Sequence, residues 1–512
     1  MKKEKKTIFD LRNSAACLLS LALKQRFPSA LLLPGKVTPL GFYCDFSFSG
    51  LFDDQCLRQV EEVMQSWIRQ KMDVQIREMV AMSAKEYFSF HKEPFLAKHV
   101  ESFSSSSTFP LMQIAGHMVL SESSSAFPDL GEIGAFCLQK VEHVGLKLRI
   151  HGTAFFEKEE LKEFLKLSER WEHSSHVALG KKMELFEEGE FGEWLWFPDG
   201  QKSRSLLKKR IEAEEELQGF SRVSSLPISE DVSLGAFSES HQKFFERQDL
   251  ARVFKFSECA TFCSSEVNDS MAGLLDSFLC QGIRSHVFCQ KKDLLDELIS
   301  CLHFMTKIFK ILGFAFRPVL FEVSKGEFKE VSSLFFKALR AFLEGSQMEV
   351  ELAFDGVPRI EWSVEDGLGR SWPVACISAV LPFEEGVVSF ASSCCLSFER
   401  VIALLLEKEE GYLPFWLSSV QIKVVPLQKK HNALAKETLA FLRNEGFRVD
   451  LCSDGGELKT LLRQALESGV PYVVVIGDKE LETNTITLRD VRAKQAQSLP
   501  LQELIEVLKK VN

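Results

Sequence analysis

The C-terminal stretch Val420-Gln421-Ile422-Lys423-Val424-Val425-Pro426 is typical of a buried β-strand, and it begins a regular alternation of strands and helices. A helical run extends from His431 to Gly446, and a short strand at 447–451 precedes a second helix. The segment 470–480 contains a third strand, and 485–489 leads into a final amphipathic helix. This order predicts a small sheet flanked by helices.

The composition is that of a globular protein with several domains. The 512 residues predict two to four domains, and the 45% hydrophobic content is sufficient for several cores. The net charge is −10, which excludes a global basic field around the molecule. Residues 411–512 nevertheless hold 14 Lys and Arg against 12 Asp and Glu. This asymmetry favours contact with a polyanion through the C-terminal part.

The cysteines and the N-terminal residues bear on the cellular compartment. Thirteen cysteines without regular spacing indicate a reducing environment. Lysines within 2–6 precede an apolar stretch at 15–23 that imitates a signal peptide, but Asp10 and Arg12 interrupt the approach. No segment approaches the ~18 uninterrupted apolar residues of a membrane span. We therefore expect a cytoplasmic protein with no membrane segment.

The remaining chain mixes helical and strand patterns without regular alternation. In the first region, Leu11–Phe27 and Asp53–Met72 predict helices, and Gly41–Phe48 alternates like a strand. In the middle region, Trp194–Gly200 predicts an aromatic strand that enters a turn, and Lys202–Leu217 predicts a long helix. These patterns indicate an α+β fold with an antiparallel or mixed sheet in the middle region.

Several short segments carry a resemblance to a known family. They occur in the same order as landmarks of the family: Gly41–Phe46, Glu93–Phe95, His151–Ala154, Trp196–Gly200, Gly367–Trp372 and Ser397–Arg400. Together with the C-terminal alternation, they make the chain resemble threonyl-tRNA synthetases, which are class II aminoacyl-tRNA synthetases, over nearly its whole length. The resemblance implies an editing-like domain at 1–165, a class II catalytic-like core at 166–410 and an α/β anticodon-binding domain at 411–512.

The editing-like region lacks most of the family's reactive residues. The His-x-x-x-His pair of the family falls at Asn13 and Cys17, a family Cys falls at about Gln113, and one family His is kept as His117. Asn has no group that exchanges a proton near pH 7, as His does. Cys17 lies on an apolar helical face, which is typical of a buried structural thiol. We therefore expect editing to be lost, with His117 as a remnant.

The catalytic-like core departs from the family at its phosphate-binding positions. The motif 2 Arg falls at Ser264, while Glu266 keeps the companion Glu. Removing one preorganised donor to a developing charge typically costs ~3–4 kcal/mol, or about 10²–10³ in rate. Glu399 and Arg400 match the end of motif 3; Arg400 either contacts the triphosphate of ATP, the substrate that the resemblance implies, or pairs with Glu399 or another carboxylate. Two further positions on the family's substrate-binding strand fall at Cys376 and Ser378.

The family's zinc ligands are incompletely kept. The resemblance places the first ligands at Cys259 and His286, and the third falls at about Ala391. Two protein ligands rarely hold zinc, so we expect the metal to be lost. His173 and His176 lie three apart on a predicted helix without further ligands, and we interpret them as surface histidines. The cysteines near enough in sequence to substitute are Cys263 and Cys289.

The anticodon-binding region departs least from the family. The resemblance gives Glu480 and Arg489 contacts with anticodon bases, and Arg492 adds charge for phosphate. Arg suits base edges and stacking, and Glu accepts from an exocyclic amine. The alternative is that Gly477-Asp478 is only a turn and Arg489 only a solvated charge.

Three functions remain open. The first is a threonyl-tRNA synthetase-like protein that binds tRNA through 411–512, with adenylation and editing lost. The second is an active threonine–tRNA ligase with a drifted active site. The third is a regulatory partner of a complete synthetase. We expect a homodimer through the middle region, where Pro227 matches the motif 1 proline, or a heterodimer with a full-length synthetase.

Overall fold

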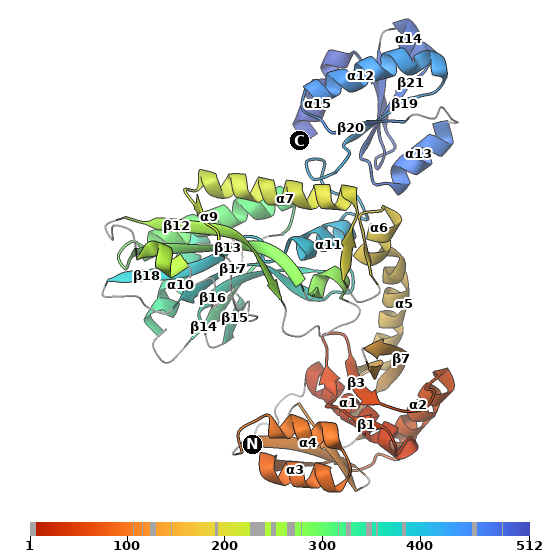
Figure 1. The fold of residues 1–512 in the computed structure, drawn as a ribbon, viewed down its shortest axis with the longest axis vertical. Helices are drawn as coiled ribbons and strands as arrows, with labels where there is room; N and C mark the ends of the chain where they lie inside the picture. The colour runs from red at the N-terminus through yellow and green to blue at the C-terminus, as the bar shows by residue number, and fades with distance from the viewer. Residues whose placement is uncertain are drawn as a thin grey trace. The chain divides into compact units, whose positions relative to one another are not determined.

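The structure is a computed structural model, shown in Figure 1. The chain divides into two compact units, Met1–Arg170 and Trp171–Asn512, and each is described by itself. No helix within the described residues is both long and apolar enough to cross a membrane. The residues that the structure describes are 7–105, 107–114, 116–122, 130–144, 146–189, 193–225, 241–246, 252–263, 272–277, 279–315, 317–323, 329–344, 351–354, 357–380, 386–452, 458–483 and 485–511.

The first unit contains two antiparallel sheets with helices packed on them. The bounds of its elements are α1 (Ile8–Arg26), β1 (Leu31–Leu32), β2 (Lys36–Val37), β3 (Phe42–Ser47), α2 (Asp54–Arg69), β4 (Gln75–Val80), α3 (Ala81–Phe90), α4 (Pro94–Glu101), β5 (Thr108–Ile114), β6 (His117–Leu120), η1 (Leu130–Glu132), β7 (Ala135–Val144) and β8 (Lys147–Phe155). One sheet has the order β1-β3-β8-β7 with β2 paired to β3, and the other has the order β4-β5-β6. The helix α5 (Lys158–Ser174) runs across the boundary between the two units.

Helix α1 is the central element of the first unit. A capping box begins it, because the Thr7 side chain accepts from the Asp10 N–H and the Asp10 carboxylate accepts from the Thr7 N–H. Every residue from Asp10 to Leu23 is buried, and the helix contacts α2, β3, β6 and β8. The apolar stretch at 15–23 is therefore the buried centre of a helix that is enclosed on all sides.

The second unit is built on an eight-stranded sheet. Its elements before the C-terminal part are α6 (His176–Lys182), β9 (Phe186–Glu188), β10 (Trp194–Trp196), α7 (Pro198–Leu217), β11 (Ser221–Arg222), β12 (Phe254–Cys263), η2 (Gly273–Asp276), β13 (Leu279–Gln290), α9 (Leu294–Leu312), β14 (Pro318–Glu322), α10 (Lys329–Phe342), β15 (Glu351–Phe354), β16 (Arg359–Glu365), β17 (Ser371–Val380), β18 (Val387–Ser393) and α11 (Phe398–Lys408). The sheet order is β11-β12-β13-β18-β17-β16-β14-β15, antiparallel except for the two edge pairs. The expected turn at 198–200 is instead the first turn of α7, because proline at the first helical position starts a helix well.

The strand register assigns side chains to two faces of this sheet. Ser257 and Ser285 pair across β12 and β13, and both hydroxyls donate to the Glu215 carboxylate on α7, so their face lies against α7. Side chains alternate along a strand, so Glu258 and His286 lie on the opposite face. That face, here called the His286 face, is defined by Glu258, Arg284, His286, Ala391 and Ser378.

The C-terminal part is a five-stranded sheet with helices on both faces. Its elements are β19 (Ile422–Pro426), η3 (Lys429–His431), α12 (Asn432–Asn444), β20 (Val449–Leu451), α13 (Leu458–Glu467), β21 (Tyr472–Ile476), α14 (Asp478–Thr483), β22 (Ile486–Asp490), β23 (Ala496–Leu499) and α15 (Leu501–Val511). The order is β20-β19-β21-β22-β23, parallel over the first three strands. Residues of α12 and α15 pack on one face, and residues of α13 pack on the other (Figure 1). The predicted alternation of strands and helices is confirmed.

A buried histidine links the elements around α6. His176 has no exposed surface, in contrast to the expected surface histidine. Its Nδ1 lies 2.6 Å from Glu407 Oε1, and its Nε2 accepts from the Leu274 N–H at 3.1 Å. The Nδ1 therefore carries the proton and donates to Glu407, whose other oxygen accepts from the Gly367 N–H. Burial raises the pKa of Glu407, but the hydrogen bonds from His176 and from the Gly367 N–H outweigh burial, so this pKa lies below its usual value.

This carboxylate makes the stability of the second unit sensitive to acid. A lowered pKa in the folded state means that ionised Glu407 stabilises the fold above the pKa of the unfolded chain. That contribution is lost as the pH falls through the folded-state pKa. We expect the urea midpoint, followed by tryptophan fluorescence, to fall less between about pH 5 and about pH 3 in Glu407→Gln than in the unmodified chain. Equal losses in both proteins would contradict this role.

Candidate functional site

A row of side chains crosses the His286 face. His286 on β13 lies directly beside Ala391 on β18, and Ala391 lies beside Ser378 on β17. Cys376 follows two residues before Ser378 and lies beside Ser393. The positions that the resemblance selected thus meet in space, although they come from three strands. Besides His286, these positions carry the thiol of Cys376 and the small side chains of Ala391 and Ser378.

The structure does not bring Cys259 and His286 together. Cys259 pairs with Ile283 and His286 pairs with Phe256, so the two side chains project from opposite faces of the sheet. Cys259 lies near Lys208 on the α7 side, and burial raises the pKa of its thiol. Cys289 shares this side of the sheet, while the side chain of Cys263 is outside the described residues.

Among the described residues, the donor set around His286 does not fit zinc. No group of three His, Cys, Asp or Glu side chains within the described ranges is placed to hold a metal ion. Zinc sites in proteins use at least three such ligands. The predicted pair of Cys259 and His286 is therefore not part of a shared zinc site in this structure, and Ala391 supplies no third ligand beside His286.

His286 instead joins a hydrogen-bonded chain that the sequence did not indicate. Its Nδ1 lies 2.7 Å from His241 Nδ1, and His241 Nε2 lies 3.1 Å from Glu258 Oε1. Ser225 donates to the same carboxylate through its hydroxyl and its backbone N–H. Burial raises the pKa of Glu258, but the hydrogen bonds of His241 and Ser225 outweigh it and keep the pKa low. Burial, then the charges of His241 and Arg284, lower the pKa of His286 to about 3.

The protonation of this chain follows from its partners. An ionised Glu258 accepts from His241 Nε2, so that nitrogen carries a proton. The 2.7 Å contact between the two Nδ1 atoms requires one of them to donate and the other to accept. No spacing signature marks His241, because it lies 45 residues before its partner. This series of hydrogen bonds can orient the His286 ring. Its three members, His286, His241 and Glu258, are bonded to one another.

The motif 3 residues are held by the protein itself. Glu399, at the start of α11, pairs with Arg204 of α7 and accepts from the Gln281 N–H at 3.0 Å. Arg400 donates to the Leu275 carbonyl at 2.7 Å and to the Pro373 carbonyl at 2.8 Å. Burial lowers the pKa of Arg400. The ion pair of Glu399 is thus with Arg204 and not with Arg400. The remaining predicted positions, Ser264, Glu266 and Pro227, are outside the described residues.

Arg284 is a guanidinium that sequence reasoning missed. It lies on the His286 face, is 5% exposed, and donates to Ser393 Oγ at 3.1 Å. Burial lowers its pKa to about 10, so it stays charged at neutral pH. The sequence feature that could have identified Arg284 is its place within the apolar strand β13. Arginine is almost never fully buried without a partner or a function. It gives this face a positive charge.

The predicted anticodon residues meet on one side of β22. Glu480 of α14 accepts from the Gly477 N–H at 2.9 Å and from Thr487 Oγ1 at 2.6 Å. Arg489 follows Thr487 by two residues, so both side chains project from the same face. Burial raises the pKa of Glu480, but these hydrogen bonds outweigh it and hold the pKa low. Arg489 is half-buried, and its side chain forms no hydrogen bond or ion pair with the described residues.

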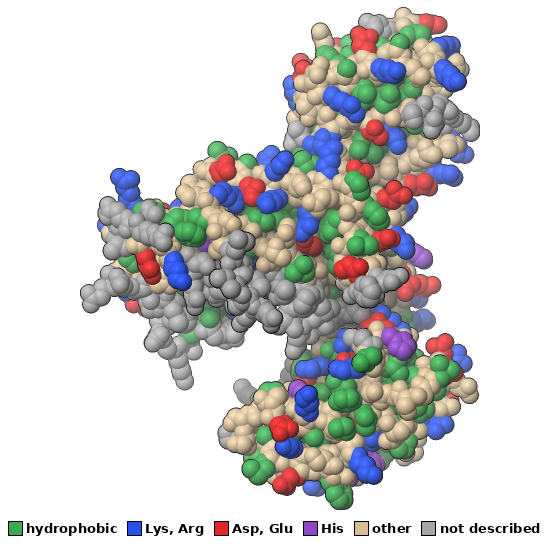
Figure 2. All heavy atoms as spheres, viewed as in Figure 1, with side chains coloured by type: hydrophobic (Ala, Val, Ile, Leu, Met, Phe, Trp, Pro, Cys, Tyr) green, Lys and Arg blue, Asp and Glu red, His purple; other side chains and the backbone are tan. Residues whose placement is uncertain are grey.

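Arg492 is engaged differently. Its Nη1 donates to Glu409 Oε2 at 2.7 Å, and its guanidinium lies 5.6 Å from the centre of the Tyr412 ring. The carboxylate of Glu409 already neutralises this guanidinium, so a phosphate would compete with it for Arg492. On the face shown in Figure 2, Lys and Arg side chains of the C-terminal part are spread rather than gathered in one patch. Arg489 is thus better placed than Arg492 for a direct contact with nucleic acid.

The editing-like region has its polar centre away from His117. Asn13 Nδ2 donates to Ser121 Oγ at 2.9 Å, and Asn13 Oδ1 accepts from the Glu122 N–H at 3.1 Å. Cys17 Sγ lies 3.5 Å from the Leu120 carbonyl oxygen. A cavity of 420 Å³ adjoins Ser121 and Glu122. His117 is exposed at the other end of β6 and lines a different cavity. The polar neighbours of Asn13 are therefore Ser121 and Glu122, in place of the predicted Gln113 and His117.

Cys17 is expected to be unreactive in the folded protein. It is 2% exposed, and burial raises the pKa of its thiol to about 12. Alkylation requires the thiolate and access to it. Mass spectrometry after brief treatment with iodoacetamide should show Cys56, which is partly exposed, modified well before Cys17. Equal labelling of the two thiols would contradict a structural role for Cys17, and urea-unfolded protein provides the control for full labelling.

Comparisons with known proteins agree on one family. Residues 421–511 match the model of the anticodon binding domain. The threonine–tRNA ligase of Saccharophagus degradans is 27% identical, with 94% of this chain and 85% of that protein covered. The enzyme of the same name from Campylobacter lari is 26% identical, with 99% and 93% covered. A crystal structure described as the RNA binding domain of threonyl-tRNA synthetase from Cryptosporidium parvum superposes with a TM-score of 0.58 at 21% identity, covering 66% of this chain and 98% of that one.

These matches extend over the ranges in which the landmarks of the family occur, and they agree with the observed sheets. The solved structure supports the fold alone, while the relatives span nearly the whole chain. The chain is therefore a threonyl-tRNA synthetase-like protein of mixed α and β structure, with an anticodon-binding domain at its C-terminus.

Proposed function

We propose that the chain binds tRNA through residues 411–512 and neither forms an adenylate nor edits a mischarged ester. The observation that carries the tRNA proposal is Arg489. It lies in the region that matches the anticodon-binding model, beside the Thr487–Glu480 pair, with its guanidinium uncommitted among the described residues. A guanidinium in this state can stack on a base or bind its edge. The negative charge of the rest of the chain favours contact through this part alone.

The proposal that adenylation is lost rests on the His286 face. Ala391 lies beside His286, and Ser378 lies beside Ala391, at positions where the resemblance implies metal and substrate ligands. Arg400 is bound to two backbone carbonyls, and Glu399 is paired with Arg204. The charged groups of Arg400 and Glu399 therefore hold neighbouring parts of the protein together, and this leaves fewer of them for binding a nucleotide.

The proposal that editing is lost rests on the region around α1. Asn13 and Cys17 occupy the positions of the reactive pair in the family that the chain resembles. The amide nitrogen of Asn13 donates to Ser121 and its oxygen accepts from Glu122, and the thiol of Cys17 is buried. Neither group transfers a proton at neutral pH.

One observation favours a working threonine–tRNA ligase as the alternative. Arg284 places a buried guanidinium on the His286 face, where a charged substrate group would lie. The curated relatives also carry the name threonine–tRNA ligase. Their identity of 25–27% is compatible with either outcome, so the assay of the reaction decides.

The experiment measures two quantities on one preparation of the full chain. Fluorescence anisotropy with labelled tRNA measures binding, and a single-stranded RNA of equal length measures non-specific affinity at the same salt concentration. Threonine-dependent exchange of pyrophosphate into ATP measures adenylation. Retained preference for tRNA without exchange supports the proposal, and no preference for tRNA overturns it. Mass photometry, with and without a full-length threonine–tRNA ligase, tests the homodimer and the heterodimer.

A further inference from the structure

A hollow of 380 Å³ in the second unit has no role in the functions proposed above. It lies where the end of α9, the segment 409–416, the start of β21 and the end of β22 meet. Sites for small molecules usually occupy about 300–1,000 Å³, so the hollow is large enough for such a ligand. The aromatic side chains in its wall are Tyr412, Phe415, Trp416 and Tyr472.

One of these rings already has a cation beside it. The guanidinium of Arg492 lies 5.6 Å from the centre of the Tyr412 ring while its Nη1 is bound to Glu409 at 2.7 Å. A positive charge near an aromatic face is attracted by the negative face of the π-system. Trp416 and Tyr472 are half-buried, as Tyr412 is, so part of each ring stays accessible. The wall of the hollow therefore suits a positively charged group.

A second carboxylate in the wall has no cationic partner among the described residues. Asp490 lies directly opposite Tyr472 across β21 and β22, so both side chains are on the same face of the sheet. Its carboxylate accepts from the neutral Ala493 N–H at 2.7 Å and forms no ion pair with the part of the chain that the structure describes. Burial, then the charge of Asp490, raises the pKa of the Tyr472 hydroxyl, so the two groups are close. Since Glu409 and Arg492 neutralise each other, Asp490 leaves the hollow with a net negative charge.

We propose that this hollow binds a small organic cation with an apolar body, such as an alkylated ammonium ion, with Asp490 as its counter-ion and the rings of Tyr412 and Tyr472 against its apolar groups. Aromatic rings beside a carboxylate suit a ligand that is both positively charged and apolar. A phosphate would be repelled by Asp490. A metal cation such as Mg²⁺ or Ca²⁺ requires several oxygen ligands, which the rings do not supply. The hollow includes neither Arg489 nor any residue of the His286 face, so this proposal is independent of the proposed function.

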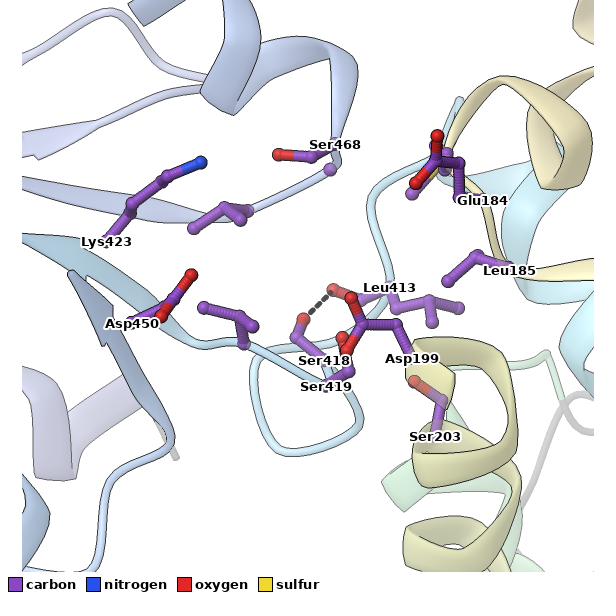
Figure 3. A pocket seen from close by; sticks show the side chains of 14 residues that line it. Glu184, Leu185, Asp199, Ser203, Leu413, Ser418, Ser419, Lys423, Asp450 and Ser468 are labelled. Carbon is purple, nitrogen blue, oxygen red and sulfur yellow. Dashed lines mark hydrogen bonds between the residues drawn. The ribbon is translucent and has the colours of Figure 1, made fainter. Parts of the chain in front are cut away.

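A smaller hollow in the same unit separates the contribution of the rings from that of the charge (Figure 3). It has a volume of 130 Å³ and is lined by Glu184, Asp199 and Asp450, with Lys423 beside Asp450 on the neighbouring strand. The described residues in its wall include no aromatic side chain. A cation that merely follows negative charge would bind in both hollows, whereas one that requires rings would bind in the larger hollow.

Calorimetric titration of the full chain with choline, at constant ionic strength, tests the proposal. The neutral alcohol 3,3-dimethylbutan-1-ol has nearly the same shape as choline and lacks its charge. We expect choline to bind, and the alcohol to bind at least about 5-fold more weakly. Asp490→Asn and Tyr472→Leu should each weaken choline binding about 5- to 30-fold, because each removes one contact with the cation. Tyr472→Phe keeps the ring and should bind choline as the unmodified chain does.

Asp199→Asn is the matched control, because it removes a carboxylate from the hollow without rings and should leave choline binding unchanged. An equal loss of binding in Asp199→Asn and Asp490→Asn would overturn the proposal, since choline would then follow negative charge alone. Equal binding of the neutral alcohol, or tighter binding of adenosine than of choline, would also overturn it. So would the absence of choline binding up to about 10 mM. Circular dichroism checks that each variant is folded, and Asp490→Asn keeps the test decisive if Tyr472→Leu does not fold.

Discussion

Threonine-dependent exchange of pyrophosphate into ATP is expected to be at least about 100- to 1,000-fold slower with this chain than with the Campylobacter lari threonine–tRNA ligase. The resemblance places the phosphate-binding arginine of the family at Ser264. A missing preorganised donor alone accounts for this factor, and the missing ligand at Ala391 adds to it. Arg400 compensates little, because two of its three guanidinium nitrogens, Nε and Nη1, are bound to the Leu275 and Pro373 carbonyls.

A variant of the chain tests the reason for this loss. Ala391→His would place a second imidazole directly beside His286 on the neighbouring strand. We expect zinc affinity, measured by competition with a chromogenic chelator, to rise in Ala391→His. Ser378→His, one strand further from His286, is the matched control and should gain less. Exchange by the unmodified chain at the rate of the Campylobacter enzyme would contradict the proposed loss of adenylation.

Replacing Arg489 with alanine is expected to weaken tRNA binding by about 10- to 100-fold, which corresponds to the ~1–3 kcal/mol of a good arginine–base contact. Its guanidinium is uncommitted among the described residues, so the substitution removes a contact with RNA without breaking one within the protein. Fluorescence anisotropy at one fixed salt concentration measures the change. The thermal midpoint of the variant should remain that of the unmodified chain.

Arg492→Ala is the matched control for Arg489→Ala. Both arginines lie near the end of β22, but Arg492 is already paired with Glu409 and contributes less to RNA binding. Arg492→Ala should therefore change tRNA affinity only a few-fold and should lower the thermal midpoint slightly. A larger loss of affinity in Arg492→Ala than in Arg489→Ala would reverse the assignment of the two residues.

The sequence predicts local features better than pairings between distant segments. The strand at 420–426 and the helix after it follow from local periodicity, and the structure has them as β19 and α12. The face occupied by Cys259 depends on the register between β12 and β13, since a shift of one residue moves every side chain to the other face. The contact of His241 with His286 depends on that same register and on a segment that packs on the sheet. No local pattern encodes either.

In the first unit, the position of His117 likewise depends on strand register, which the sequence does not predict. The resemblance identifies the hairpin of β5 and β6, but the register decides which of its residues approach Asn13. Ser121 and Glu122 are those residues, four and five positions after His117. A small polar residue at the end of a strand carries little signal, because it is equally typical of a loop.

The enclosed helix α1 has a consequence for the synthesis of the protein. Its apolar surface is covered by β3 and β8, and β8 begins at Lys147. A ribosome that adds about 5–20 residues each second therefore needs roughly 6 to 26 seconds between completing α1 and completing β8. Throughout that interval the nascent chain presents an uncovered hydrophobic helix. We expect this segment to be a binding site for chaperones on the ribosome.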